Sequence, residues 1–180
     1  MEWHKRTGFL VIGLVTFRVI WGFVGSHHAR FANFVRGPTG IMEYVRDKAA
    51  ESAGHNPLGA LSVVAMLVVL AFQAGSGLFA NDDIMLEGPY AGIVGKEMSD
   101  WLTTLHKINS NVILVLVGLH IAAIAFYFFR KKINLILPML TGKKLLPPGV
   151  TTNERPTWLA PAVILLAAGM VYLLVYQWPR

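Results

Sequence analysis

The feature that most constrains this chain is a long apolar run, Trp101 to Arg130, with the sequence WLTTLHKINSNVILVLVGLHIAAIAFYFFR. Its two histidines, His106 and His120, are fourteen residues apart. On an α-helix that spacing advances about 1400°, nearly four turns, so both rings point to roughly the same face. Their Cα atoms lie ~21 Å apart along the axis. One imidazole then lies near each edge of a bilayer core of roughly 30 Å, which suggests two stacked metal or haem sites.

Composition indicates an integral membrane protein. Hydrophobic residues make up 54% of the chain and charged residues 14%, and the mean hydropathy is +0.53. We therefore predict an all-α transmembrane helical bundle. The absence of cysteine excludes disulfides, iron–sulfur clusters, thiolate zinc sites and c-type haem attachment. The net charge of +6 fits basic cytoplasmic loops, and no basic–aromatic pattern indicates nucleic-acid binding.

Three further apolar runs bring the number of predicted spanning helices to four. They are Gly8–Gly25, which we extend back to near Trp3, Leu58–Ala80 and Trp158–Trp178. The first run contains Arg18, and no small-residue cleavage site follows it, so we predict a spanning helix rather than a signal peptide.

The segments between the runs are polar. Within the connection Ser26–Pro57, residues 41–52 predict a short amphipathic helix lying on the membrane surface. Residues 81–100 are predicted to form a short acidic loop. Residues 133–156 are predicted to be a basic connection in which two adjacent prolines break any helix.

Loop charge predicts the orientation in the membrane. The 26–57 loop carries four Lys or Arg residues and the 130–156 connection carries six, whereas the loop between the second and third spans carries only Lys96. The positive-inside rule then puts both basic loops in the cytoplasm. The N-terminus, the acidic loop and the C-terminus are predicted to lie outside.

The first and third spans are therefore predicted to run in the same direction. His4 opens one and His106 opens the other, and Arg18 follows His4 by the same fourteen residues that separate His106 from His120. If these helices are neighbours, His4 and His106 form an outer level, and Arg18 and His120 form an inner level. Two facing neutral imidazoles can supply both axial ligands of a haem iron that transfers electrons.

Each of these residues also has a simpler interpretation. His106 and His120 could hydrogen-bond neighbouring helices, and His4 could be an interfacial polar residue beside two basic ones. Arg18 could pair with a haem propionate or extend toward the cytoplasmic interface. The remaining histidines, in the 26–57 loop, are predicted to be solvated or interfacial: His27, His28 and His55.

Three stretches resemble the prokaryotic cytochrome b561 family, which includes the b-type cytochrome subunits of nickel–iron hydrogenases. EWHKRTGFLVIGLVTFRVIWGFVGSHHARFANFVRGP resembles the family's second helix and the loop after it. GHNPLGALSVVAMLVVLAFQAGSGLF resembles the third helix, and WLTTLHKINSNVILVLVGLHIAAI resembles the fourth with its histidine pair. The resemblance covers residues 1–144 as a haem-binding transmembrane domain. It leaves residues 145–180 as a linker and an extra C-terminal helix.

The resemblance implies haem b and a ligand set. His4 and His106 match the ligands of an outer haem, and His120 matches one ligand of an inner haem. The family's first helix, which carries the usual partner of His120, has no counterpart here. A start upstream of Met1 is the favoured explanation, and loss of a helix is the alternative. Without that first helix, the chain is expected to complete one haem site and to leave the second site lacking one ligand. A histidine of another copy of the protein could supply that ligand.

The function implied by the resemblance is that of an electron-transfer subunit of a respiratory-chain membrane oxidoreductase in the bacterial inner membrane. Electrons would pass between the quinone pool and a partner redox protein, such as a cytochrome c attracted by the acidic loop. The alternative is a non-haem transmembrane anchoring or transport subunit, in which the histidines only form hydrogen bonds between helices.

Overall fold

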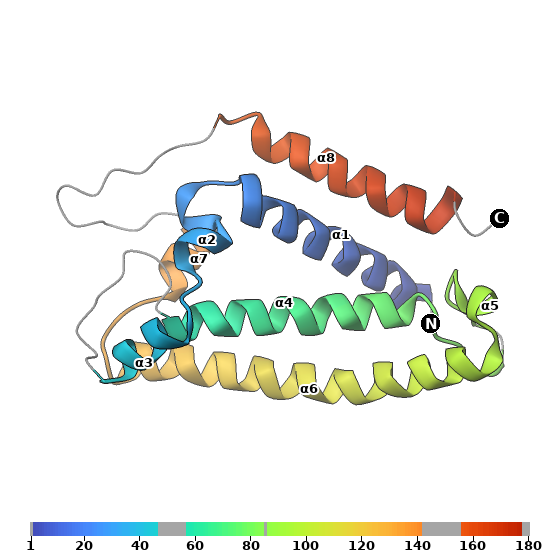
Figure 1. The fold of residues 1–180 in the computed structure, drawn as a ribbon, viewed down its shortest axis with the longest axis horizontal. Coiled ribbons are helices and arrows are strands. Elements are labelled where there is room, and N and C mark those ends of the chain that lie inside the picture. The colour runs from blue at the N-terminus through green and yellow to red at the C-terminus, as the bar shows by residue number, and fades with distance from the viewer. Residues whose placement is uncertain (1, 47–56, 85, 142–155, 178–180) are drawn as a thin grey trace.

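The computed structural model describes residues 2–46, 57–84, 86–141 and 156–177, and it is dominated by four long helices (Figure 1). These are α1 (Glu2–Val24), α4 (Pro57–Gly77), α6 (Lys96–Phe129) and α8 (Leu159–Tyr172), which continues into the π-helix η2 (Leu173–Gln177). The short elements are η1 (His27–Ala29), α2 (Phe31–Phe34), α3 (Pro38–Arg46), α5 (Ala91–Val94) and α7 (Ile136–Thr141). These ranges contain no β-strand, only an isolated bridge between Asn81 and Glu87.

The four predicted spans are confirmed. All four helices are long and apolar enough to cross a membrane, with α8 and η2 taken together as Leu159–Gln177. Their apolar side chains point outward along much of their length. Leu114 of α6 and Leu165 of α8, for example, are 69% and 73% exposed. Outward-facing apolar side chains of this kind suit a protein surrounded by lipid.

The helices are arranged in the spatial order α8, α1, α4, α6 (Figure 1). α4 packs against α6 on one side and against α1 on the other, and α8 packs against α1. The N-terminus and α5 lie at one end of the bundle, called here the α5 end (Figure 1). The short helices α2, α3 and α7 lie at the opposite end, called here the α3 end.

Helix α1 crosses α4 obliquely. The two are close at the α5 end and diverge toward the α3 end (Figure 1). A groove of about 570 Å³ lies between them, lined only by apolar side chains of α1, of α4 and of the segment around α2, among them Val19, Phe31 and Leu67. The oblique course therefore separates the C-terminal half of α1 from the α4–α6 pair.

Helix α6 begins at Lys96, ahead of the apolar run that opens at Trp101. Gly95 has a φ of 77°, a left-handed conformation that favours glycine, and it forms the corner between α5 and α6. The first turn of α6 is stabilised by an ion pair between Lys96 and Asp100 and by Glu97, whose charge complements the helix dipole. The acidic segment is thus partly helical rather than a continuous loop.

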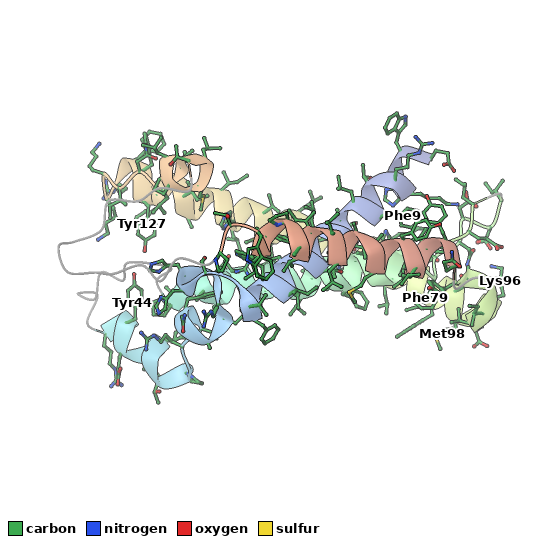
Figure 2. The ribbon with its side chains drawn as sticks, turned by 90° about the horizontal axis from the view of Figure 1, so that it is seen from above. Phe9, Tyr44, Phe79, Lys96, Met98 and Tyr127 are labelled. Atoms are coloured by element: carbon green, nitrogen blue, oxygen red, sulfur yellow. The ribbon has the colours of Figure 1, made fainter. Side chains whose placement is uncertain are left out.

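Side-chain hydrogen bonds hold this acidic segment on α6. The Asn81 amide group donates to Ser99 Oγ and to Asp100 Oδ1, at 2.6 and 2.8 Å. The hydroxyl of Ser99, which is 2% exposed, donates to the carbonyl of Phe79. Lys96 also pairs with Asp83. These contacts fix the connection between α4 and α6; Figure 2 labels Phe79 and Lys96, which lie at the α5 end.

The α3 end differs from the prediction in two short helices. The surface helix expected over residues 41–52 is observed as α3, which begins at Pro38, and its part beyond residue 46 lies outside the described residues. Helix α7 was not predicted. It begins after Asn134, whose side chain accepts hydrogen bonds from the amides of Ile136 and Leu137. Tyr44 of α3 and Tyr127 of α6 point toward one another, with their hydroxyls 3.4 Å apart (Figure 2).

The close return of the acidic segment onto α4 generates a stability prediction. A Cβ added at Gly88 would lie 2.3 Å from the carbonyl oxygen of Leu78, so Gly88→Ala requires the backbone to shift. We expect this substitution to destabilise the protein by about 1–3 kcal/mol and to lower its midpoint of thermal unfolding in detergent. Gly92→Ala is the matched control, because a Cβ at Gly92 would meet nothing within 4 Å. Equal midpoints for the two variants would contradict this description.

Candidate functional site

The structure brings His4 and His106 together at the α5 end. His4 lies in the first turn of α1, and His106 lies ten residues into α6. Their ring centroids are 6.0 Å apart and their planes are inclined at 81°. His4 is exposed and His106 is half-buried. The two helices that carry these residues therefore meet here, although α6 packs mainly against α4, and α1 packs against both α8 and α4.

The His106 imidazole is held by α4. Its Nδ1 lies 3.0 Å from the backbone carbonyl oxygen of Gln73 and 3.1 Å from the hydroxyl of Ser76. Its Nε2 lies 3.0 Å from the side-chain amide nitrogen of Gln73. The ring thus has a polar partner on both nitrogens, each supplied by the last two turns of α4.

These partners define the tautomer of His106. A carbonyl oxygen only accepts hydrogen bonds, so Nδ1 carries the proton and donates it to Gln73. The amide nitrogen of Gln73 only donates, so Nε2 accepts through its lone pair. A neutral imidazole protonated on Nδ1, with Nε2 as the acceptor, is the form in which many metal-ligating histidines are held by a backbone carbonyl.

Two further residues complete this arrangement. Asn109, one turn along α6, donates to the Gln73 side-chain oxygen at 2.7 Å and to the carbonyl of Val69 at 3.0 Å. Gly77 allows the ring to approach α4, because a Cβ there would lie 3.1 Å from Cε1 of His106. The site is therefore shaped by a glycine and by amide side chains on both helices.

Arg18 and His120 are not brought together. No hydrogen bond, ion pair or cation–π contact joins them, although both residues are described. The Arg18 guanidinium lies 5.0 Å from the ring of Phe31 and 5.9 Å from the ring of Phe34. Its Nη1 is buried and has no hydrogen-bond partner among the residues that the structure describes. The inner level of Arg18 and His120 concerned the depth of the two residues and stays a prediction; the structure shows no contact between them, and α1 diverges from the α4–α6 pair toward the α3 end (Figure 1).

The remaining histidines lie apart from this site. His120 is half-buried on α6 and has no hydrogen bond or ring contact among the described residues. His27 is exposed, and His28 is half-buried with a buried Nε2 that has no hydrogen-bond partner among the described residues; both are compatible with the predicted solvated or interfacial place. His55 lies outside the described residues. In the part of the chain that the structure describes, no group of three or more His, Cys, Asp or Glu side chains could hold a metal ion.

The residues that hold His106 were not predicted from the sequence. Gln73 is the one amide side chain in the apolar run of the second span, and Asn109 lies three residues after His106. A buried amide in a membrane span requires a hydrogen-bond partner, which is the signal that could have identified both.

Comparison with known proteins supports one family. No significant match was found among curated proteins, and none among solved structures. The model of the prokaryotic cytochrome b561 family matches residues 1–142. That match supports a multi-pass membrane b-type cytochrome in electron transfer and implies haem b binding. Since the matched region covers well over half of the chain, this protein belongs to the prokaryotic cytochrome b561 family.

Proposed function

We propose that the protein is an electron carrier in which His4 and His106 ligate one haem b at the α5 end. The observation that carries the proposal is the 6.0 Å separation of the two imidazole centroids. Two imidazoles on opposite sides of a metal have facing nitrogens about 4 Å apart, and centroids roughly 6 Å apart, since metal–nitrogen bonds are about 2 Å long. The spacing thus suits a pair of axial ligands.

The surrounding residues fit the group. Haem, when bound, supplies a one-electron redox centre whose potential depends on its ligands and their surroundings. The Gln73 carbonyl holds the Nδ1 proton of His106 and so directs the Nε2 lone pair to act as the ligand. Near His4, a Cβ added at Gly8 would meet nothing within 4 Å, which leaves room for a bulky planar group beside α1.

We further propose that the α5 end faces the outside and carries electrons between a quinone pool and a partner redox protein. Basic residues at the α3 end, Arg130, Lys131 and Lys132 among them, support this orientation through the positive-inside rule. The exposed acids at the α5 end, Asp83 and Glu97, support a basic partner such as a cytochrome c.

The same geometry also favours a second candidate, a non-haem anchoring or transport subunit. That candidate requires His106 to act as a hydrogen-bonding group between helices, and its contacts with Gln73 and Ser76 have this form. The two candidates agree on Nδ1 and differ on Nε2, which ligates iron in one and stays bound to the Gln73 amide in the other. The visible spectrum separates them.

The first prediction concerns the two proposed ligands. The purified protein is expected to show a Soret band and a sharp α band after reduction, and His4→Ala and His106→Ala are each expected to lose most of the bound haem. His27→Ala is the matched control, since His27 is an exposed histidine away from the site. Haem-to-protein ratios measured by absorption provide the test. Absence of both bands in the unmodified protein would favour the non-haem candidate, and unchanged haem in His106→Ala would refute the ligand assignment.

The second prediction concerns His120. Because His120 lacks a facing histidine among the described residues, we expect one haem per chain and an unchanged haem-to-protein ratio in His120→Ala. Haem quantification against protein concentration provides the measurement. A ratio that falls by half in the variant would mean that His120 ligates a second haem.

The third prediction concerns Gly77. A leucine at this position would displace the His106 ring, since even a Cβ approaches Cε1 to 3.1 Å. We expect Gly77→Leu to lose haem. Gly75→Leu, two residues earlier on the same helix, is expected to retain it because a Cβ at Gly75 meets nothing within 4 Å. Equal haem content in the two leucine variants would show that the close approach of α4 to His106 is not needed.

A further inference from the structure

We propose that Gln73 is the positioning residue of His106: its backbone carbonyl selects the ligating tautomer, and its side-chain amide competes with the cofactor for the Nε2 lone pair. The inference rests on the proposed role of His106 as a haem ligand. Its two parts involve different atoms of one residue, so a side-chain substitution removes one part and leaves the other in place.

The backbone part is a shared hydrogen bond. The Gln73 carbonyl oxygen lies 3.0 Å from His106 Nδ1 and accepts a second bond from the Ser76 hydroxyl at 3.1 Å. The Ser76 oxygen itself lies 3.1 Å from Nδ1 and is 4% exposed as a residue. A proton on Nδ1 therefore has two acceptors within reach. In the other tautomer the bond to the Gln73 carbonyl is lost, and Ser76 keeps its contact only by turning its hydroxyl from that carbonyl to donate to Nδ1.

The side-chain part depends on Asn109. The Asn109 amide group donates to the Gln73 side-chain oxygen at 2.7 Å, which leaves the Gln73 nitrogen facing His106 Nε2 at 3.0 Å. Asn109 is itself fixed by its second bond, to the carbonyl of Val69. The orientation of the Gln73 amide is thus determined by a chain of donors and acceptors.

The consequence for binding follows from the single lone pair on Nε2. That lone pair can bind the Gln73 amide or a metal ion, but not both. Binding a haem through Nε2 therefore exchanges one hydrogen bond for one coordination bond, while the contact of Nδ1 with the Gln73 carbonyl persists. Gln73 sets the direction of the ligand and also opposes its use, which makes haem affinity depend on residue 73.

The variants Gln73→Leu and Gln73→Glu test this in opposite directions. Leucine removes the competing donor, so haem affinity in detergent titrations of the haem-free full chain is expected to rise roughly 2- to 10-fold, the value of one net hydrogen bond. Glutamate places an acceptor at Nε2 and favours a proton there, so affinity is expected to fall. Both variants are expected to unfold at lower temperature, because both disturb contacts between α4 and α6.

The tautomer gives a readout that does not require haem. In haem-free protein labelled with ¹⁵N-histidine, the His106 signals, assigned by their loss in His106→Asn, are expected to show a protonated Nδ1 and an unprotonated Nε2. Gln73→Leu is expected to keep this pattern, because the backbone carbonyl remains. Gln73→Glu is expected to show a protonated Nε2. The control is Asn111→Leu, an exposed asparagine on the same helix as Asn109, which should change neither affinity nor tautomer.

The outcomes separate this inference from the proposed function. If the protein binds no haem, or His106→Ala binds it normally, the proposed function fails, and with it the competition at Nε2. If His106 is needed for haem but both Gln73 variants leave affinity and tautomer unchanged, Gln73 only packs α4 against α6 and the inference alone is overturned. A purely structural role of Gln73 predicts a lower haem affinity in Gln73→Leu. The positioning role predicts a higher haem affinity in that variant, together with a lower unfolding temperature.

Discussion

The structure depends on hydrogen bonds between α4 and α6. In a bilayer the hydrophobic effect does not drive helices together, since lipid is as apolar as the side chains, so close packing and polar contacts have to hold them. Gln73, Ser76 and Asn109 supply such contacts around His106. Beyond the end of α4, the Asn81 amide likewise donates hydrogen bonds to Ser99 and Asp100 of α6. His106 is thus one of the residues that join the two helices, and the same hydrogen bonds that join them also orient its ring.

Hydropathy was enough to predict the four spans, because a bilayer requires about 20 consecutive apolar residues and each run meets that requirement. The start of α6 was missed because its first turns are polar and are stabilised by an ion pair and by the connection to Asn81, neither of which raises hydropathy. The meeting of His4 with His106 followed from the shared direction of the first and third spans. Arg18 and His120 do not touch because α1 is tilted away from the α4–α6 pair, and tilt is set by packing rather than by local sequence.

The two interpretations of His106 differ at one atom. A histidine that joins helices and a histidine that binds a metal can share the same Nδ1 contact, since a backbone carbonyl orients the ring in both cases. Arg18 illustrates the same limit of sequence patterns. Its depth in the first span left two alternatives, a haem propionate or the cytoplasmic interface, and the structure places the guanidinium beside Phe31 and Phe34, whose ring faces attract a cation. The type of a residue and its depth in the membrane therefore say less about its contact partner than the path of the neighbouring chain segment does.

The unequal lengths of α4 and α6 have a consequence for how electrons would reach the site. At ~1.5 Å per residue, the 21 residues of α4 extend about 31 Å and the 34 residues of α6 about 51 Å, so α6 exceeds a bilayer core by roughly 20 Å. His106 contacts Gly77, the last residue of α4, and so lies at the level where the shorter helix ends. The turns of α6 before His106 then rise above the hydrocarbon. A protein in the aqueous phase could come within a few side chains of the ring without entering the membrane.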